Sequence, residues 1–119
     1  MDKHQINKLI DKLFETSDSV RYVTIYHDNE LTSKQRTELT DTSNSESDKY
    51  EELFVNPTIL KIAGQRGRLD CGGLNFVIIK YGNFFQLIRE FSDGHISICI
   101  DKEENPIELE KEINKVIEN

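Results

Sequence analysis

The sequence predicts a small α+β domain in which a five-stranded antiparallel sheet carries helices on both faces, in the chain order αββαβββα. Residues 70–101 contain three apolar runs separated by Gly82-Asn83 and Asp93-Gly94, dipeptides that favour two-residue hairpin turns. A further hairpin is predicted around Asp28-Asn29, since both residues tolerate left-handed backbone angles. Apolar residues at helical spacing before, between and after these hairpins predict three helices.

The first third of the chain is predicted to form a helix and a hairpin. Apolar residues recur at i, i+3, i+4, i+7 and i+8 in residues 3–15, which indicates an amphipathic helix. Residues 20–27 are rich in β-branched and aromatic side chains and predict a strand. Residues 31–39 are polar and suit a returning strand at an exposed sheet edge.

The central helix is predicted over residues 48–66, after a polar connector. Pro57 lies within it, and proline removes a backbone donor and clashes with the preceding turn. We therefore expect either two helical pieces, with Asn56 capping the second, or one bent helix. Gly64 or Gly67 could end it with a left-handed cap. The candidate N-caps are Ser45 and Ser47.

The two-residue turns of the meander predict its register and its two faces. Tyr81 would pair with Phe84, and Ser92 with His95. The expected cross-strand row is then Val77, Ile88 and Cys99. Successive residues point to opposite faces. Face A would carry Leu74, Phe76, Ile78, Lys80, Phe85, Leu87, Arg89, Phe91, Ile96, Ile98 and Ile100. Face B would carry Asn75, Val77, Ile79, Tyr81, Phe84, Ile88, Glu90, Ser97 and Cys99.

The last helix is predicted to follow residues 102–104. Asn105 is a suitable cap, Pro106 suits the first helical position, and Glu108 complements the helix dipole. The first and last helices would cover face A, which is a core face with Arg89 and Lys80 as its charges. The central helix would lie on face B, which is only half apolar.

Composition excludes several classes of function. A chain of 119 residues is predicted to be one domain, residues 1–119, with its own core. Its net charge of −7 argues against binding to nucleic acid or to anionic membranes. No apolar run approaches the roughly 20 residues of a transmembrane helix. The polar N-terminus carries no signal-peptide pattern, so we expect a cytoplasmic protein.

No stretch predicts a catalytic residue, a cofactor or a metal. The glycines and arginines of residues 64–73 follow a helix and precede a strand, whereas phosphate cradles have the reverse order. Cys71 would need a neighbouring base to act as a nucleophile, and the histidines stand at no telling spacing from it. Cys71 and Cys99 would lie two strands apart, about 10 Å, which is too far for a disulfide.

Two segments carry a resemblance to a known family. They are Gln65-Arg66-Gly67-Arg68-Leu69-Asp70-Cys71-Gly72-Gly73-Leu74 and Tyr81-Gly82-Asn83-Phe84-Phe85-Gln86-Leu87. Together with the element order, they resemble the roadblock/LC7 fold of the longin- and profilin-like group, including uncharacterised archaeal proteins of this kind. The resemblance covers nearly the whole chain. It implies a scaffold or regulator of a small GTPase or of a larger assembly.

The sequence therefore predicts a non-enzymatic, dimer-forming interaction module. The resemblance makes residues 69–80 an outer strand with apolar residues on both faces, an edge that invites pairing with its twin. A symmetric homodimer would join two such edges and pack the central helices together. The expected interface residues are Leu53, Phe54, Leu60, Arg66, Cys71, Asn75, Val77, Ile79, Tyr81 and Phe84. The alternative is a small-ligand sensor with a pocket between central helix and sheet, near Val77, Ile79, Tyr81 and Cys99.

Overall fold

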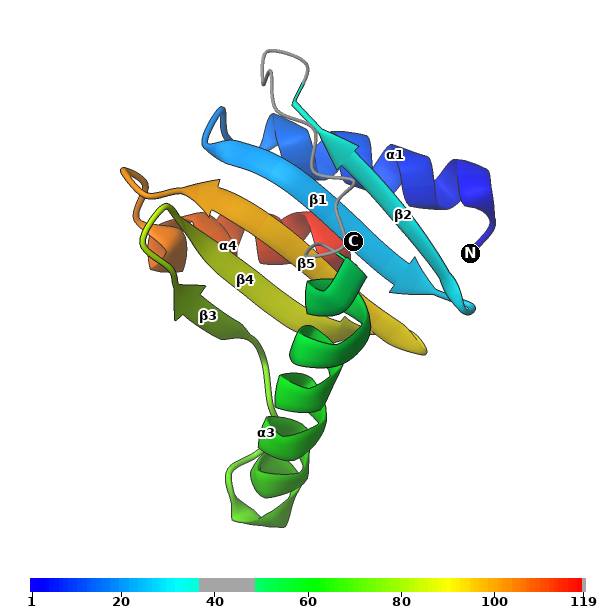
Figure 1. Ribbon diagram of the computed structural model, residues 1–119, viewed down its shortest axis with the longest axis vertical. Helices are drawn as coiled ribbons and strands as arrows, with labels where there is room; N and C mark the ends of the chain where they lie inside the picture. Colours follow the sequence, from blue (N-terminus) through cyan, green and yellow to red (C-terminus); the bar gives the residue numbers. More distant parts are fainter. Residues whose placement is uncertain (37–48, 119) are drawn as a thin grey trace.

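The computed structural model describes residues 1–36 and 49–118 and confirms the predicted α+β architecture (Figure 1). The sheet is antiparallel with strand order β2-β1-β5-β4-β3. Helices α1 and α4 lie on one face, and the central helix lies on the other, crosses the strands and projects beyond the β3 edge of the sheet. The elements are α1 (Lys3–Glu15), β1 (Val20–His27), β2 (Glu30–Gln35), the π-helix η1 (Glu51–Val55), α3 (Asn56–Asp70), β3 (Val77–Lys80), β4 (Phe84–Phe91), β5 (Gly94–Asp101) and α4 (Pro106–Glu118).

Face A is the core face, as predicted. Large aliphatic side chains of β1, β4 and β5 pack there against the apolar stripes of α1 and α4. The core residues are Ile6, Leu9, Ile10, Leu13, Val20, Val23, Ile25, Leu87, Ile96, Ile98, Ile100, Leu109 and Ile113. Burying such side chains contributes roughly 1.5–3 kcal/mol each, so this layer holds the domain together.

The ends of α1 and α4 follow local capping rules. Asp2 accepts a hydrogen bond from the backbone N–H of Gln5, and the Gln5 side chain accepts one from the Asp2 N–H, which completes a capping box. The Asn105 side chain accepts from the N–H groups of Ile107 and Glu108, as its predicted capping role requires.

The first hairpin forms at the predicted turn, where Asp28 and Asn29 have φ angles of 55° and 63°. The strand predicted over residues 31–39 is shorter, because β2 ends at Gln35. Residues 37–39, the connector and both candidate N-caps lie outside the described residues.

The turn between β4 and β5 differs from the prediction by one residue. Phe91 pairs with Gly94, so the turn residues are Ser92 and Asp93, and Ser92 takes the positive φ of 54°. Ile88 therefore pairs with Ser97, and Cys99 with Gln86. The pairing shifts by two residues, which leaves every side chain on its predicted face.

The central helix is one continuous helix rather than two pieces. The backbone stays helical through Tyr50, Val55 and Asn56, and the Asn56 N–H bonds to the Glu51 carbonyl in a π-turn. This wider turn lies directly before Pro57, which cannot donate a backbone hydrogen bond. Asn56 is therefore a buried helical residue and not the predicted cap.

The helix also continues past the two glycines predicted to end it. Gly64 and Gly67 lie inside α3 and are buried. A Cβ on Gly67 would come within 3.0 Å of the Gly73 backbone, so this glycine permits the returning chain to pass close to the helix. Gly72 and Gly73, with φ angles of 82° and 94°, reverse the chain after Asp70. The edge strand predicted over residues 69–80 is reduced to β3 in consequence.

Candidate interaction surface

The central helix buries a stripe of mainly polar and small residues and exposes most of its large apolar residues. Its buried residues are Glu52, Asn56, Leu60, Gly64 and Gly67, spaced by four or three along one stripe. On the outside, large apolar side chains are exposed. These residues, here called the helix patch, are Tyr50, Leu53, Phe54, Ile62 and Leu69. A helix covering a core normally has the opposite arrangement.

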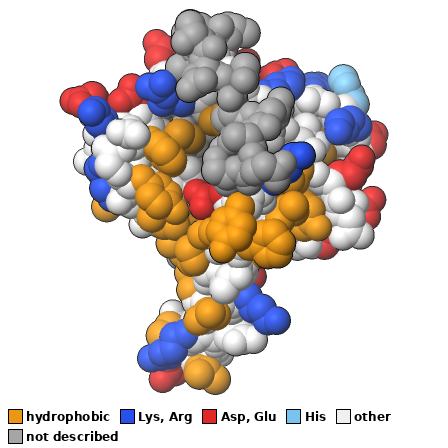
Figure 2. Space-filling model, in the orientation of Figure 1, with side chains coloured by type: hydrophobic (Ala, Val, Ile, Leu, Met, Phe, Trp, Pro, Cys, Tyr) orange, Lys and Arg blue, Asp and Glu red, His pale blue; other side chains and the backbone are white. Residues whose placement is uncertain are grey.

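The helix patch is extensive for a surface of this size. Tyr50, Phe54, Ile62 and Leu69 are 61%, 59%, 64% and 78% exposed. The rings of Tyr50 and Phe54 pack together, with centroids 5.4 Å apart. Figure 2 shows apolar side chains gathered around this helix and along its projecting part. Grouped exposed apolar residues are typical of an interaction site, whereas scattered ones are normal.

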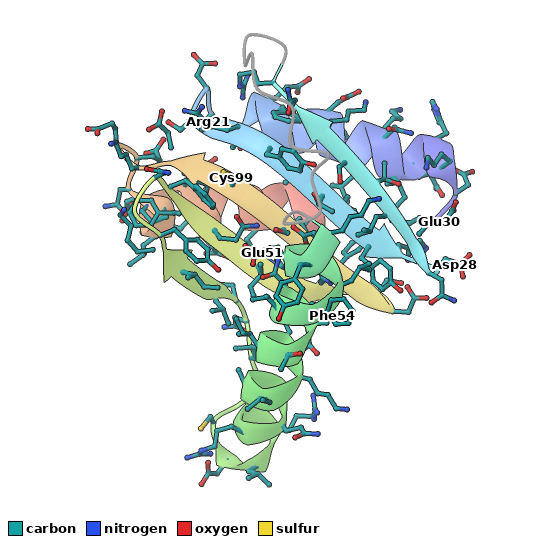
Figure 3. The ribbon with its side chains drawn as sticks, viewed as in Figure 1. Arg21, Asp28, Glu30, Glu51, Phe54 and Cys99 are labelled. Carbon is teal, nitrogen blue, oxygen red and sulfur yellow. The ribbon has the colours of Figure 1, made fainter. Side chains whose placement is uncertain are left out.

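Face B adds half-buried apolar residues beside the helix patch. Val77, Ile79, Tyr81, Phe84 and Cys99 are all of intermediate exposure. The Tyr81 and Phe84 rings are 5.3 Å apart. In Figure 3, Glu51 and Phe54 lie over the sheet on η1, and Cys99 lies on the strand beneath. The central helix thus covers only part of this face, as the sequence predicts.

Tyr81 connects the sheet to the start of the central helix. Its hydroxyl donates a hydrogen bond to a Glu51 carboxylate oxygen at 3.4 Å. Partial burial raises the pKa of the Tyr81 hydroxyl, and the nearby negative charge of Glu51 raises it further. The phenol therefore stays protonated and keeps donating at physiological pH.

The two edges of the sheet differ in chemistry. β2 presents a polar edge with the sequence Glu-Leu-Thr-Ser-Lys-Gln, and the hydroxyls of Thr24 and Ser33 are 2.9 Å apart across the β1–β2 pair. β3 has the sequence Val-Ile-Ile-Lys, and its first three residues are half-buried. Lys80 ends it, with its ammonium 5.2 Å from the centre of the Phe85 ring. Polar edges resist pairing with other chains, so β3 is the edge suited to it.

The projecting part of α3 is basic. Lys61, Arg66 and Arg68 are all exposed there. Arg66 also donates to the carboxylate of Asp70 at i,i+4, and this bond lowers the pKa of Asp70, with a smaller contribution from the Cys71 thiol. The charge contrasts with the chain as a whole, whose net charge is −7.

A buried polar cluster joins the central helix to β4 and β5. His95 Nε2 lies 2.9 Å from Glu52 Oε1, and Asn56 Nδ2 donates to the same oxygen at 3.1 Å. Asn56 Nδ2 also lies 3.4 Å from Ser97 Oγ, which bonds to the Gln86 amide. All five side chains are buried. We name this set the polar junction.

Arg89 is one of the two charges predicted on face A, and it has the carboxylate partner that this position requires. It donates to Glu118 at 3.0 Å and to Asn114 at 2.9 Å, and Glu110 lies 4.0 Å away. These residues line a polar cavity of about 390 Å³ between α4 and the segment before β3. Since Arg89 is bound by side chains of α4, its role here is to attach α4 to the sheet.

The structure brings most of the predicted interface residues to one side of the molecule. Leu53, Phe54, Val77, Ile79, Tyr81 and Phe84 lie around η1 and β3, while Arg66 and Cys71 lie at the projecting end. Leu60 is only 3% exposed and faces the sheet, so it is not part of the surface. Asn75 lines the polar cavity beside Arg89. The two thiols are not joined in a disulfide, as predicted.

Sequence reasoning missed three surface residues, Tyr50, Ile62 and Leu69. The first two lie within the predicted central helix, but neither was named as an interface residue. A signal was present, because the apolar residues of this helix are too many for one stripe. Ile62 and Leu69 stand seven residues apart, so they share one helical face.

No model of a protein family matches the sequence, and no curated protein matches it. The roadblock/LC7 resemblance therefore stays a prediction. Among residues 1–36 and 49–118, no helix is long and apolar enough to cross a membrane. Within the same residues, no three His, Cys, Asp or Glu side chains gather in a way that could hold a metal ion.

Proposed function

We propose that this protein is a non-enzymatic interaction module that forms a homodimer through β3 and the central helix. The observation that carries the proposal is the helix patch, whose large apolar side chains are exposed beside a half-covered sheet face. Burial of such side chains against a partner contributes about 25 cal/mol per Å² of apolar surface. Burial of the helix patch would therefore contribute favourable free energy to association.

The edge strand supports a symmetric arrangement. Two β3 strands could pair antiparallel about a two-fold axis, which would extend the sheet across both copies. Antiparallel pairing would bring the partner's projecting helix toward the Tyr81 and Phe84 end of β3. The apolar residues of that helix would then lie over the half-buried part of face B.

The decisive experiment measures oligomeric state by size-exclusion chromatography with light scattering. The wild-type chain is expected to be a dimer at micromolar concentration, and Phe54→Glu is expected to weaken dimerisation about 30-fold or more, the effect of losing one interface hot spot. Ile107→Glu is the matched control. Ile107 is 60% exposed, nearly the same as Phe54, but it lies on α4 at the other face of the sheet.

A monomeric wild-type chain at micromolar concentration would contradict the homodimer. A dimer that both glutamate substitutions weaken equally would contradict the assignment of the interface to the helix patch. Ile79→Lys tests the β3 edge in the same assay, because a lysine opposite its twin would repel it.

The resemblance adds a candidate partner, a small GTPase, which the module would regulate or hold in a larger assembly. Affinity capture with the wild-type chain, compared with Phe54→Glu, tests this suggestion by mass spectrometry of the eluates. A nucleotide-loaded GTPase that the wild-type chain retains and the variant loses would support it. A GTPase retained equally by both would show that the helix patch is not its binding site.

The alternative function, a ligand sensor, needs space between the central helix and the sheet. Beside the half-buried residues that would line such a pocket, the buried side chains of the polar junction bond to one another and close part of this space. This observation favours the interaction module over the sensor.

A further inference from the structure

The fully buried stripe by which the central helix contacts the sheet is largely polar. It has one large apolar side chain, Leu60, and the rest of the stripe is Glu52, Asn56 and two glycines. Leu60 and the face-B residue Ile88 are both buried, yet neither belongs to the cluster that forms the core on face A. The helix is thus held by a contact separate from the main core.

The polar contacts are of a kind whose net contribution is small. Hydrogen bonds made in the folded state replace bonds to water, so each stabilises only modestly. Burial of the Glu52 carboxylate carries a desolvation cost that its contact with His95 must offset. Asn56 Oδ1 is buried without a hydrogen-bond partner among the described residues. Water would satisfy this oxygen if the helix moved away.

We propose that η1 and the first half of α3 detach from face B as one unit, while the sheet, α1 and α4 stay folded. This movement is called undocking below. The hydrogen bonds of the polar junction hold the helix on the sheet in the docked state. The π-turn contributes to this contact because it places Glu52 and Asn56 over the sheet. Undocking would uncover Ile88, His95 and Ser97 on face B. Any partner that binds the undocked state would shift the population toward it. This proposal does not rest on homodimer formation.

The proposal predicts separate stabilities for the helix and the core. In native-state hydrogen exchange on the full chain, amides of η1 and α3 are expected to exchange at least about 100-fold faster, relative to their intrinsic rates, than those of β1, β4, β5 and α4. Equal protection of the helix and the core strands would overturn the proposal. A dilution series separates this result from dimerisation, since undocking within one chain does not depend on concentration.

Substitutions in the polar junction test directly whether its contacts hold the helix on the sheet. His95→Leu leaves the Glu52 carboxylate buried without its ring partner, and helix exchange is expected to accelerate on the order of 100-fold while exchange in the core is unchanged. In the double variant Glu52→Leu/His95→Leu two apolar side chains replace the buried carboxylate and its ring partner, and the helix is expected to exchange more slowly than in His95→Leu alone. Acceleration of helix and core to the same extent would show that the helix opens only by global unfolding.

Two further variants keep the test decisive. Glu52→Gln retains an acceptor oxygen and leaves no buried charge, so it covers the case in which His95→Leu does not fold. Its helix amides are expected to exchange about threefold to tenfold faster than those of the wild-type chain. An unchanged rate would contradict the role of the polar junction in holding the helix on the sheet. His27→Leu is the matched control, because His27 pairs with Asp93 away from the central helix, and it should leave helix exchange unchanged.

Discussion

Gly94 is the residue whose substitution the structure predicts most sharply. It begins β5, directly after the turn, and lies against β1. A Cβ built at Gly94 would lie 1.8 Å from the carbonyl oxygen of Tyr26 and 2.7 Å from its carbonyl carbon. Both atoms belong to the backbone of β1, so no rotation of a side chain relieves the contact.

The size of the expected effect follows from this distance. Ordinary contact begins at 3.4 Å, so Gly94→Ala would require β1 and β5 to separate locally by about 1.6 Å. Such a movement breaks the end of the β1–β5 ladder, where Tyr26 pairs with His95. Strain and lost hydrogen bonds together are expected to lower the free energy of unfolding by about 3 kcal/mol. For a chain of 119 residues this corresponds to about 12 °C in Tm.

Urea unfolding followed by circular dichroism measures the effect, with Gly82→Ala as the matched control. Gly82 also lies at a hairpin turn, but an added Cβ there meets nothing within 4 Å. The control is expected to change the free energy of unfolding by no more than about 0.5 kcal/mol. Equal stability of the two variants would refute the β1–β5 contact and with it the position of this turn.

Three more predictions follow from particular contacts. Arg89→Met keeps the aliphatic stem but releases α4, and should lower the free energy of unfolding by about 2 kcal/mol, against about 0.5 or less for the exposed Lys111→Met. A hydrogen bond from Ser19 lowers the pKa of Glu104 from its ordinary 4.5, so the ionised carboxylate stabilises the fold above that pH. The stability difference between wild type and Glu104→Gln, measured by urea unfolding, should therefore shrink as pH falls below about 4.5. In thiol labelling of the folded chain, exposed Cys71 should react before the half-buried thiol of β5.

The sequence predicted the strand order of the meander, the face of each side chain and both covered faces of the sheet. Alternation of apolar and polar residues is a local signal, so it predicted the faces correctly even where the predicted register was wrong. The β4–β5 pairing moved by two residues, an even number, so that Ile98 stayed on face A and Ser97 on face B.

Three of the errors share a physical cause, the role of glycine. Gly94 was assigned to a turn, and Gly64 and Gly67 to helix ends, because local rules connect glycine with unusual backbone angles. In the structure, Gly94 and Gly67 instead allow another segment to approach closely, Tyr26 in one case and Gly73 in the other. Local sequence cannot show which distant backbone will come near, so these positions could not be predicted.

The candidate interaction surface was only partly predictable for a related reason. An apolar residue in a helix is normally expected to face the core, so apolar character alone did not mark Tyr50 and Ile62 as surface residues. The central helix largely inverts this arrangement, because Glu52 and Asn56 are buried and most of its large apolar side chains, Leu60 excepted, are exposed. As a result, the helix makes few large apolar contacts with its own sheet, and burial of its exposed apolar side chains against a second surface would be favourable. The same arrangement therefore explains both the weak attachment of the central helix to its sheet and the exposed helix patch. A partner that covers the helix patch would either pull the helix away from the polar junction or hold it more firmly there. Comparing helix exchange at low and high protein concentration, below and above the proposed dimerisation, would show which of the two occurs.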